Sequence, residues 1–546
     1  FATPALTNQE LSAMESLSRS FTNLTEGKPL SVNADVSSSP LLVGLLTILA
    51  TLVVYQLVLA PPSSLRSKSS KIQPILSAIP FLGSVDFYND RIKFLRKHFG
   101  NPENKGFHQG ARRLTVRDNS IIVLAGNKQD AKTFFYSRTL KFTQAYERLF
   151  SGIPTEITVN AIMDQDKSDA MFRENLKQAI RGERLAKLAP QMCEDTLRSV
   201  TALSDWQKRK GTFDPKAFTF PLLFCMSMRT VGFSDLSDQP EMMERLADYY
   251  WAMENAASYW STFFSKYPFQ SSRIKEESGK KLFAELTKAA KRRVEEGSVE
   301  DDTVTMLMDK DLGADYAVRF VVTSLFAAII NSTAMSMWML LFFGAAPELR
   351  KRAAKEVFDY LDSMADGQGS DWTSKSRVEQ LQALSLDEWE NGFPLIEACL
   401  KETMRTVSDG TLFRLNMGDY KGAPPKVHGE EMRKGEFLAY WTGATHFNAS
   451  IYPDPHRWDP ERWARGEGSG DMEFLAWGTG MHPCTGMRFA KLEIKNFTTT
   501  MLALMDWETI DPRTGKAFTL DTLPKADLNK QERPTSEPVA IRFTRY

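Results

Sequence analysis

Cysteine is scarce in this chain, and the few cysteines present do not form any of the usual frameworks. The chain has four cysteines among its 546 residues: Cys193, Cys225, Cys399 and Cys484. None of them belongs to a CxxC pair or to the spacing of a zinc knuckle, and a disulfide scaffold is not expected from so few widely separated residues. Such usage is typical of a reducing compartment, where most cysteines are small buried hydrophobes.

Net charge is also missing. Lys+Arg and Asp+Glu each total 68, so the formal net charge is zero and the chain lacks the basic field that holds nucleic-acid phosphates. We therefore expect no nucleic-acid partner. Apolar residues make up 42% of the chain, enough to bury a large core, and no internal repeat or low-complexity tract is present. These features predict a globular protein.

One long apolar run lies in the N-terminal part of the chain. Residues 41–60 form the segment LLVGLLTILATLVVYQLVLA, which carries no charge. At about 1.5 Å per residue it matches a bilayer hydrocarbon core of about 30 Å. A cleaved signal peptide has a shorter apolar region close to its start, whereas residues 1–40 here are mostly polar. The run therefore predicts a single transmembrane helix, with a buried core helix as the alternative.

The flanking charges predict the orientation of this helix. Arg66, Lys68 and Lys71 follow the run, whereas acids outnumber bases in residues 1–40. Because positive charge is retained on the cytosolic side, we expect the C-terminal bulk of the chain to be cytosolic. Residues 1–40 are then a short lumenal segment, in which Asn23 begins a glycosylation sequon.

The rest of the chain divides once. Residues 61–84 mix Pro, Ser and basic residues, as expected of a stiff hinge over a negatively charged membrane surface. No second linker follows, so residues 85–546 are predicted to form one domain. Its size exceeds that of most domains, which favours lobes around a shared core or cofactor.

A glycine-rich loop surrounds the last cysteine. Residues 474–490 are FLAWGTGMHPCTGMRFA. Gly478 and Gly480 precede Cys484 and allow a tight, bulged turn, and Gly486 follows it and permits close approach of a flat cofactor. Helical apolar spacing continues beyond the loop, so the sulfur is predicted to lie near a helix N-terminus, which favours the thiolate. A buried structural cysteine in a turn is the alternative.

This loop resembles the haem-binding signature of the cytochrome P450 superfamily, aromatic-x-x-Gly-x-basic-x-Cys-x-Gly. Trp477 stands at the aromatic position, where Phe is commoner, and His482 stands at the basic position, as in the sterol 14α-demethylases. The resemblance implies a mostly α fold with small β-sheets, with Cys484 as the axial ligand of haem b iron. It also implies that His482 contacts a haem propionate. A thiolate ligand pushes electron density toward bound oxygen.

Two upstream segments extend the resemblance. Glu402 and Arg405 lie on one face of a predicted helix, and Pro460-Glu461-Arg462 ends a Pro-rich segment. They resemble the Glu-x-x-Arg helix and the Pro-Glu-Arg segment of the superfamily. The resemblance implies that Glu402, Arg405 and Arg462 meet in a buried charged triad behind the haem, with a structural role because a buried charge needs a partner.

Basic candidates for the propionates and for a redox partner follow from the same resemblance. Arg414 comes after the Glu-x-x-Arg helix, and an ordinary surface arginine is the alternative. Arg173, Lys177, Arg181 and Arg184 form one basic stripe on a predicted helix. Arg173 or Lys177 would bond a propionate, and Arg181 and Arg184 would receive the reductase. A solvated helix face is the alternative for all four.

A second long apolar segment lacks the expected catalytic pair. Residues 320–343 are apolar nearly all round, which indicates a buried helix. Aligned through Trp338, the acid-Thr pair of the superfamily falls on Ile330-Asn331, and Ser332 follows. Asn331, with Ser332 as the fallback, is the candidate for positioning a proton donor. Cholesterol 7α-hydroxylase-like and prostacyclin synthase-like members also have Asn here; the first insert oxygen and the second isomerise an endoperoxide.

The resemblance implies an NADPH-dependent monooxygenase of the endoplasmic reticulum membrane. Its electrons would come through NADPH-cytochrome P450 reductase, with cytochrome b5 as a possible second donor, and its substrate would be a lipophilic molecule such as a terpenoid, sterol or other specialised metabolite. Two alternatives stay open: a haem-thiolate isomerase or dehydratase that needs no electrons, and a non-catalytic haem protein. Sterol 14α-demethylation is not expected, because the His-Thr of that family is Ile330-Asn331 here.

Overall fold

The computed structural model describes residues 44, 46–51, 70–75, 83–104, 107, 109–149, 154–162, 165–256, 269–365, 370–418 and 423–546. They belong to two compact units. One takes in Phe1–Val85 and Arg112–Ile121, and the other Asp86–Ala111 and Ile122–Tyr546. All predicted haem-site residues lie in the second, larger unit.

In the smaller unit, β1 (Gln73–Pro74) pairs in parallel with β2 (Gly110–Val116) through Arg112 and Arg113. Only residues 44 and 46–51 of the apolar run 41–60 are described, and they are helical. Asn23 and the whole of residues 1–40 lie outside the described residues, as does most of the predicted hinge.

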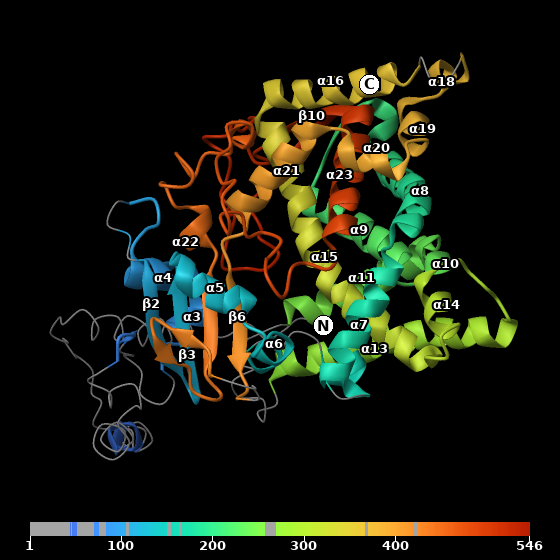
Figure 1. The fold of residues 1–546 in the computed structure, drawn as a ribbon. Helices are drawn as coiled ribbons and strands as arrows, with labels where there is room; N and C mark the ends of the chain where they lie inside the picture. Colours follow the sequence, from blue (N-terminus) through green and yellow to red (C-terminus); the bar gives the residue numbers. More distant parts are fainter. Residues whose placement is uncertain are drawn as a thin grey trace. The chain divides into compact units, whose positions relative to one another are not determined.

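The larger unit is built around α15 (Gly313–Ala345), which runs through its helical part (Figure 1). It packs against α9 (Pro215–Val231), α13 (Gln270–Glu296) and α23 (Met487–Leu504). Within the described part of the chain, α15 alone is long and apolar enough to span a membrane, but 78% of its most apolar window is buried in protein. The prediction of a buried helix is confirmed, because apolar residues all round a helix need protein on every side.

The larger unit has the following further helices, in chain order. They are α3 (Asp86–Asn89), α4 (Arg91–Phe99), α5 (Lys128–Tyr136), α6 (Thr143–Leu149), α7 (Gln165–Ala179), α8 (Gly182–Thr201), α10 (Ser234–Ser237), α11 (Pro240–Asn255), α14 (Thr303–Met308), α16 (Pro347–Ser363), α18 (Ser370–Ser374), α19 (Arg377–Gln382), α20 (Leu386–Asn391), α21 (Pro394–Val407) and α22 (Gly443–His446). Short 3-10 turns are η3 (Thr155–Ile157), η4 (Val159–Ala161), η5 (Trp206–Lys208) and η6 (Pro460–Trp463).

The sheets are small. Antiparallel strands β4 (Leu140–Lys141), β6 (Thr411–Asn416) and β9 (Phe437–Trp441) lie side by side. A second sheet has the order β10-β11-β5, formed by Met505–Ile510, Ala540–Arg545 and Lys210–Phe213. Further short strands are β3 (Asn119–Ala125), β7 (Lys426–Val427) and β8 (Glu430–Glu431). The predicted class, mostly α with small β-sheets, is confirmed.

The predicted single helix with a continuous basic stripe is wrong. α7 ends at Ala179 and α8 begins at Gly182, with Arg181 between them in an extended conformation at φ −65° and ψ 156°. The break turns Arg184 into the core, where its Nε donates to the Ala179 carbonyl at 3.1 Å and its Nη2 to Thr303 Oγ1 at 3.4 Å. Arg184 is therefore not at the surface to receive a protein partner.

Candidate functional site

The loop around Cys484 is folded by its glycines. Gly478 and Gly480 take left-handed φ values of 68° and 69°, which favour glycine strongly. The Cys484 N–H donates to the Trp477 carbonyl at 2.7 Å and closes the loop. A Cβ on Gly480 would lie 2.2 Å from the Phe135 carbonyl oxygen, at the end of α5. Backbone packing, in addition to the turn, therefore requires glycine at this position.

Cys484 differs from the other cysteines in its surroundings. Its side chain is exposed, whereas Cys193 and Cys399 are buried. Nearby protein atoms raise the pKa of the Cys484 thiol, and a hydrogen bond from the Gly486 N–H to the sulfur opposes that rise. A Cβ on Gly486, which caps α23, would meet no atom within 4 Å. The sulfur thus has a backbone donor and open space beside it, as a metal ligand for a flat cofactor requires.

Arg414 lies on β6 and is 2% exposed. Its Nη1 donates to the Phe413 carbonyl at 2.8 Å, but its Nε is buried with no hydrogen-bond partner in the described part of the chain. Its guanidinium lies over the rings of Phe134 and Phe142, at 4.7 and 5.0 Å from their centroids. Burial lowers the pKa of Arg414 to about 10, so it stays cationic at neutral pH. An orphaned buried cation of this kind fits an anionic ligand.

His482 and Arg173 join this cluster. The His482 ring stacks on Phe142 with centroids 5.7 Å apart and planes at 23°. Burial, followed by the cations Arg414 and Arg173, lowers the pKa of His482 to about 4, so its imidazole is neutral at pH 7. Lys177 is exposed one turn further along α7 and is not among the charges that act on His482. The positive potential here suits acidic groups such as haem propionates.

Glu402, Arg405 and Arg462 form a closed network. All three are at most 1% exposed. Arg405 makes a bidentate pair with Glu402 at 2.7 and 3.0 Å, and Arg462 Nε donates to Glu402 Oε1 at 2.9 Å. Arg462 also pairs with Glu467, and Arg405 Nη1 donates to the His446 carbonyl at 2.7 Å. Two acids balance two arginines, so the network needs no outside ion.

The two candidates on α15 face different ways. Asn331 is exposed, as is Ala327 one turn earlier, and Thr323 one turn before that is half-buried, so a stripe of this otherwise buried helix faces open space. Ser332 is 3% exposed and lies close to Glu493 on α23, a carboxyl whose pKa burial raises to about 8. Asn331 is therefore accessible, whereas Ser332 belongs to the core.

Two residues of this site carried no recognisable signal in the sequence. Phe142 follows β4 and belongs to no motif, yet it packs against both Arg414 and His482. Arg533 comes from the connection between β10 and β11, and its Nη1 donates to Asn331 Oδ1 at 3.3 Å. Both residues are far in sequence from the groups they contact, so only the fold brings them together.

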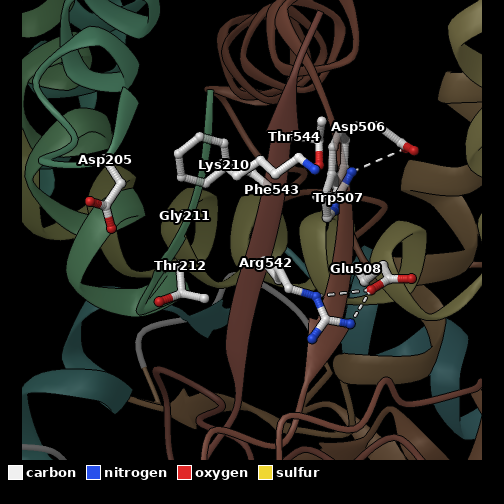
Figure 2. A pocket seen from close by; sticks show the side chains of 10 residues that line it. All are labelled: Asp205, Lys210, Gly211, Thr212, Asp506, Trp507, Glu508, Arg542, Phe543 and Thr544. Atoms are coloured by element: carbon white, nitrogen blue, oxygen red, sulfur yellow. Dashed lines mark hydrogen bonds and ion pairs between the residues drawn. The ribbon is translucent and has the colours of Figure 1, made fainter. Parts of the chain in front are cut away.

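A separate hollow of about 590 Å³ lies over the second sheet, between β5, β11 and β10 (Figure 2). Its walls carry both charges, and Arg542 pairs with Glu508 across the strands. None of the predicted site residues lines it. This hollow is therefore distinct from the Cys484 loop and the stripe on α15.

Comparison with known proteins gives a consistent result. The family model for cytochrome P450 matches residues 114–527. Cytochrome P450 monooxygenase AacuE of Aspergillus aculeatus is 24% identical over 495 residues, covering 89% of this chain and 95% of that protein. Cytochrome P450 monooxygenase dmxR5 of a Cryptosporiopsis species is 24% identical over 449 residues, covering 81% and 84%. Ent-kaurenoic acid oxidase 1 of Arabidopsis thaliana is 30% identical over 162 residues, covering 30% and 29%.

Proposed function

Because the chain belongs to the cytochrome P450 family, and relatives matching most of its length are named monooxygenases, we propose that it oxidises a lipophilic small molecule as a haem-thiolate monooxygenase. The observation that carries the proposal is the loop of Cys484, whose exposed sulfur has a backbone donor and open space beside it. Haem b is the proposed cofactor.

The residues present fit this cofactor. Cys484 would bind its iron, and the propionates would meet Arg414, Arg173 and His482, where the buried Nε of Arg414 needs an acceptor. Trp477, Gly478 and Gly480 hold the loop in position, and Lys177 is the weaker candidate for a propionate. When bound, thiolate-ligated haem supplies the activation of molecular oxygen.

On α15, Asn331 is proposed to orient the water that delivers a proton, since an amide positions a proton source without titrating. Its exposure on the α15 stripe supports this role. Ser332 is instead a supporting residue, because it is buried and lies close to Glu493 in the core.

The electrons are proposed to come from NADPH through NADPH-cytochrome P450 reductase, with cytochrome b5 as a second donor. Burial of Arg184 removes it from the partner surface, which leaves the exposed Arg181 as the candidate. The substrate is proposed to be a terpenoid, sterol or other lipophilic specialised metabolite. The name of one partial relative, ent-kaurenoic acid oxidase, supports such a substrate.

Membrane attachment through residues 41–60 is part of the proposal. Residues 46–51 are helical and expose Leu46, Ile48 and Leu49, as a lipid-facing helix would. The proposed location is the endoplasmic reticulum membrane, with a single span, Asn23 glycosylated in the lumen and the catalytic domain in the cytosol.

A turnover assay tests the proposed reaction. The purified full chain, with reductase and NADPH, should convert members of a lipophilic library to products that contain one atom of ¹⁸O from labelled oxygen gas. Cys484→Ser should lose both turnover and the thiolate Soret band of the reduced CO complex. Cys225→Ser is the control, because Cys225 is half-buried and its thiol donates to the Ser237 carbonyl at 3.4 Å. A normal thiolate band in Cys484→Ser would refute the ligand.

A haem-thiolate isomerase is the second candidate. The absence of an acid-alcohol pair at Ile330-Asn331 on α15 favours it. Conversion of a lipid peroxide without NADPH, together with no incorporation of ¹⁸O from oxygen gas, would establish the isomerase in place of the monooxygenase.

A further inference from the structure

Arg533 is fastened to α15 at two levels. The Trp338 Nε1–H donates to the Arg533 carbonyl at 2.8 Å, and Arg533 Nη1 donates to Asn331 Oδ1 at 3.3 Å. Seven residues, about two helical turns, separate Asn331 from Trp338. Arg533 also has a left-handed backbone with φ 46°, which is unfavourable for a residue with a Cβ. Such strain persists where the surroundings hold the residue in place, often at a functional site.

The charge of Arg533 is not balanced by a carboxylate, unlike the charges of the buried arginines Arg229 and Arg350. Arg229 pairs with Asp195 at 2.9 Å, and Arg350 pairs with Asp506 at 2.6 Å. Arg533 has no carboxylate within ion-pair distance among the described residues. Its Nη1 donates to two neutral oxygens, Asn331 Oδ1 and the Gln531 carbonyl at 2.6 Å.

The surroundings of Arg533 explain why this matters. The side chain is only half-buried, so solvent reaches it, yet surrounding protein lowers its pKa to about 10. Protein therefore surrounds much of this guanidinium, while part of it stays accessible. At neutral pH it is still protonated, and Nε and Nη2 make no hydrogen bond to the described residues. A cation with free donors therefore faces the same open space as Asn331.

A guanidinium with free donors matches the two oxygens of a carboxylate, and such charge-assisted bonds are stronger in a desolvated site. Asn331 adds to this match. Because Arg533 can only donate, the atom it contacts must be the amide oxygen, which leaves the Asn331 Nδ2 as a further donor. Resting on the proposed function, we infer that Arg533 binds a carboxylate of the substrate, so the molecule oxidised is a lipophilic carboxylic acid held beside Asn331.

Binding of matched acids and esters tests this assignment. The probes are dodecanoic acid and 2-naphthoic acid, each with its methyl ester, titrated at pH 7.5 into the haem-loaded full chain while the Soret band is recorded. At least one acid should bind more tightly than its ester. Arg533→Gln should lower the affinity for that acid by roughly tenfold to hundredfold, the range for hydrogen bonds to charged groups. The affinity for the ester should stay unchanged. Arg533→Lys should retain part of the preference.

Arg513→Gln is the matched control. Arg513 lies in the same connection between β10 and β11, but it is exposed and paired with Asp511 and Glu537 at 3.0 Å each. This variant should keep the wild-type ratio of acid to ester affinity. A loss equal to that of Arg533→Gln would show that the connection, rather than the guanidinium of Arg533, sets the preference, and would overturn the assignment.

Three further outcomes would overturn it. The wild type could show no preference for either acid, Arg533→Gln could weaken acid and ester equally, as loss of a structural strap would, or it could lose haem, as loss of a propionate partner would. Equilibrium dialysis of ¹⁴C-dodecanoic acid does not depend on haem spectra. If the proposed function fails while dialysis still shows Arg533-dependent acid binding, the carboxylate site stands and only the reaction is wrong.

Discussion

Two clusters in the larger unit, each built on buried arginine, differ in what balances their charge. In the triad, Arg405 and Arg462 meet Glu402, and Glu467 supplies a second acid, so every charge has its counterpart inside the protein. In the other cluster, Arg414 is packed between aromatic rings and has a buried Nε with no acceptor in the described residues. Both are deeply buried, and both come from the same stretch of chain.

This difference in charge balance distinguishes a structural cluster from a ligand-binding cluster. A closed set of charges has already offset its desolvation and can only support the fold. An open set keeps an uncompensated cation that gains free energy when an anion arrives. Arg405 and Arg414 are both buried, so burial does not distinguish their roles. The presence of a carboxylate partner does, because Arg405 has one and Arg414 has none among the described residues.

Removing the carboxylate that balances the buried triad should have the largest effect on stability. Glu402→Ala leaves Arg405 and Arg462 without their shared carboxylate and should cost about 3–5 kcal/mol of unfolding free energy. The measurement is urea unfolding of the haem-loaded protein. Glu461→Gln is the control, since Glu461 is next to Arg462 but makes an exposed pair with Arg352, worth at most about 1 kcal/mol. Equal losses in the two variants would contradict the triad's role.

Replacing the unbalanced cation Arg414 should instead affect haem retention. Arg414→Gln removes a buried cation whose Nε lacks an acceptor, so folding should tolerate it, while haem should dissociate roughly tenfold to hundredfold faster. Transfer of haem to apomyoglobin measures that rate. Arg433 is exposed and lies in the connection between β8 and β9. As the control, Arg433→Gln should leave the rate of haem loss unchanged. Normal haem retention in Arg414→Gln would remove Arg414 from the propionate site.

A similar contrast separates two neighbouring residues of α15, since Asn331 is exposed and Ser332 is buried. Asn331→Ala should keep haem and NADPH consumption but lower product per NADPH by about tenfold and raise peroxide, because the water that delivers the proton loses its support. Ser332→Ala should keep coupling, because Ser332 is directed at Glu493 in the core. Uncoupling in Ser332→Ala alone would exchange the two roles, and no effect in either, with turnover lacking any need for NADPH, would favour the isomerase.

The smallest expected effect is a pH dependence. The pKa of His482 in the folded protein is about 4, below the ordinary value of 6.5, so the unfolded chain takes up the proton first as pH falls. Stability from this residue is therefore present above about pH 6.5 and is lost between pH 6.5 and 4. In protein prepared without haem, His482→Gln should flatten this part of the stability curve, as measured by urea unfolding. The change should be smaller than the roughly 3 kcal/mol that the full shift implies, because solvent screens the partly exposed ring. An unchanged slope would contradict the shift.

The sequence predicted those features whose chemistry lies in short contiguous segments. The loop of Cys484 could be recognised because its glycines, its cysteine and the helix after it are adjacent in the chain. The basic stripe failed because helical spacing continues through residues 173–184 although the backbone breaks at Arg181, and periodicity does not register a single extended residue. Phe142 and Arg533 could not be predicted, since each acquires its role from a contact made across the fold.

The burial of α15 also bears on the proposed membrane topology. A hydropathy count would include α15 as a span, although 78% of its apolar window is packed in protein. Each span counted in error moves every later residue to the opposite compartment, so Cys484 would be assigned to the oxidising lumen and Asn448-Ala449-Ser450 would become a glycan acceptor. Asn448 is 6% exposed, so its side chain is too enclosed by protein to accept a glycan.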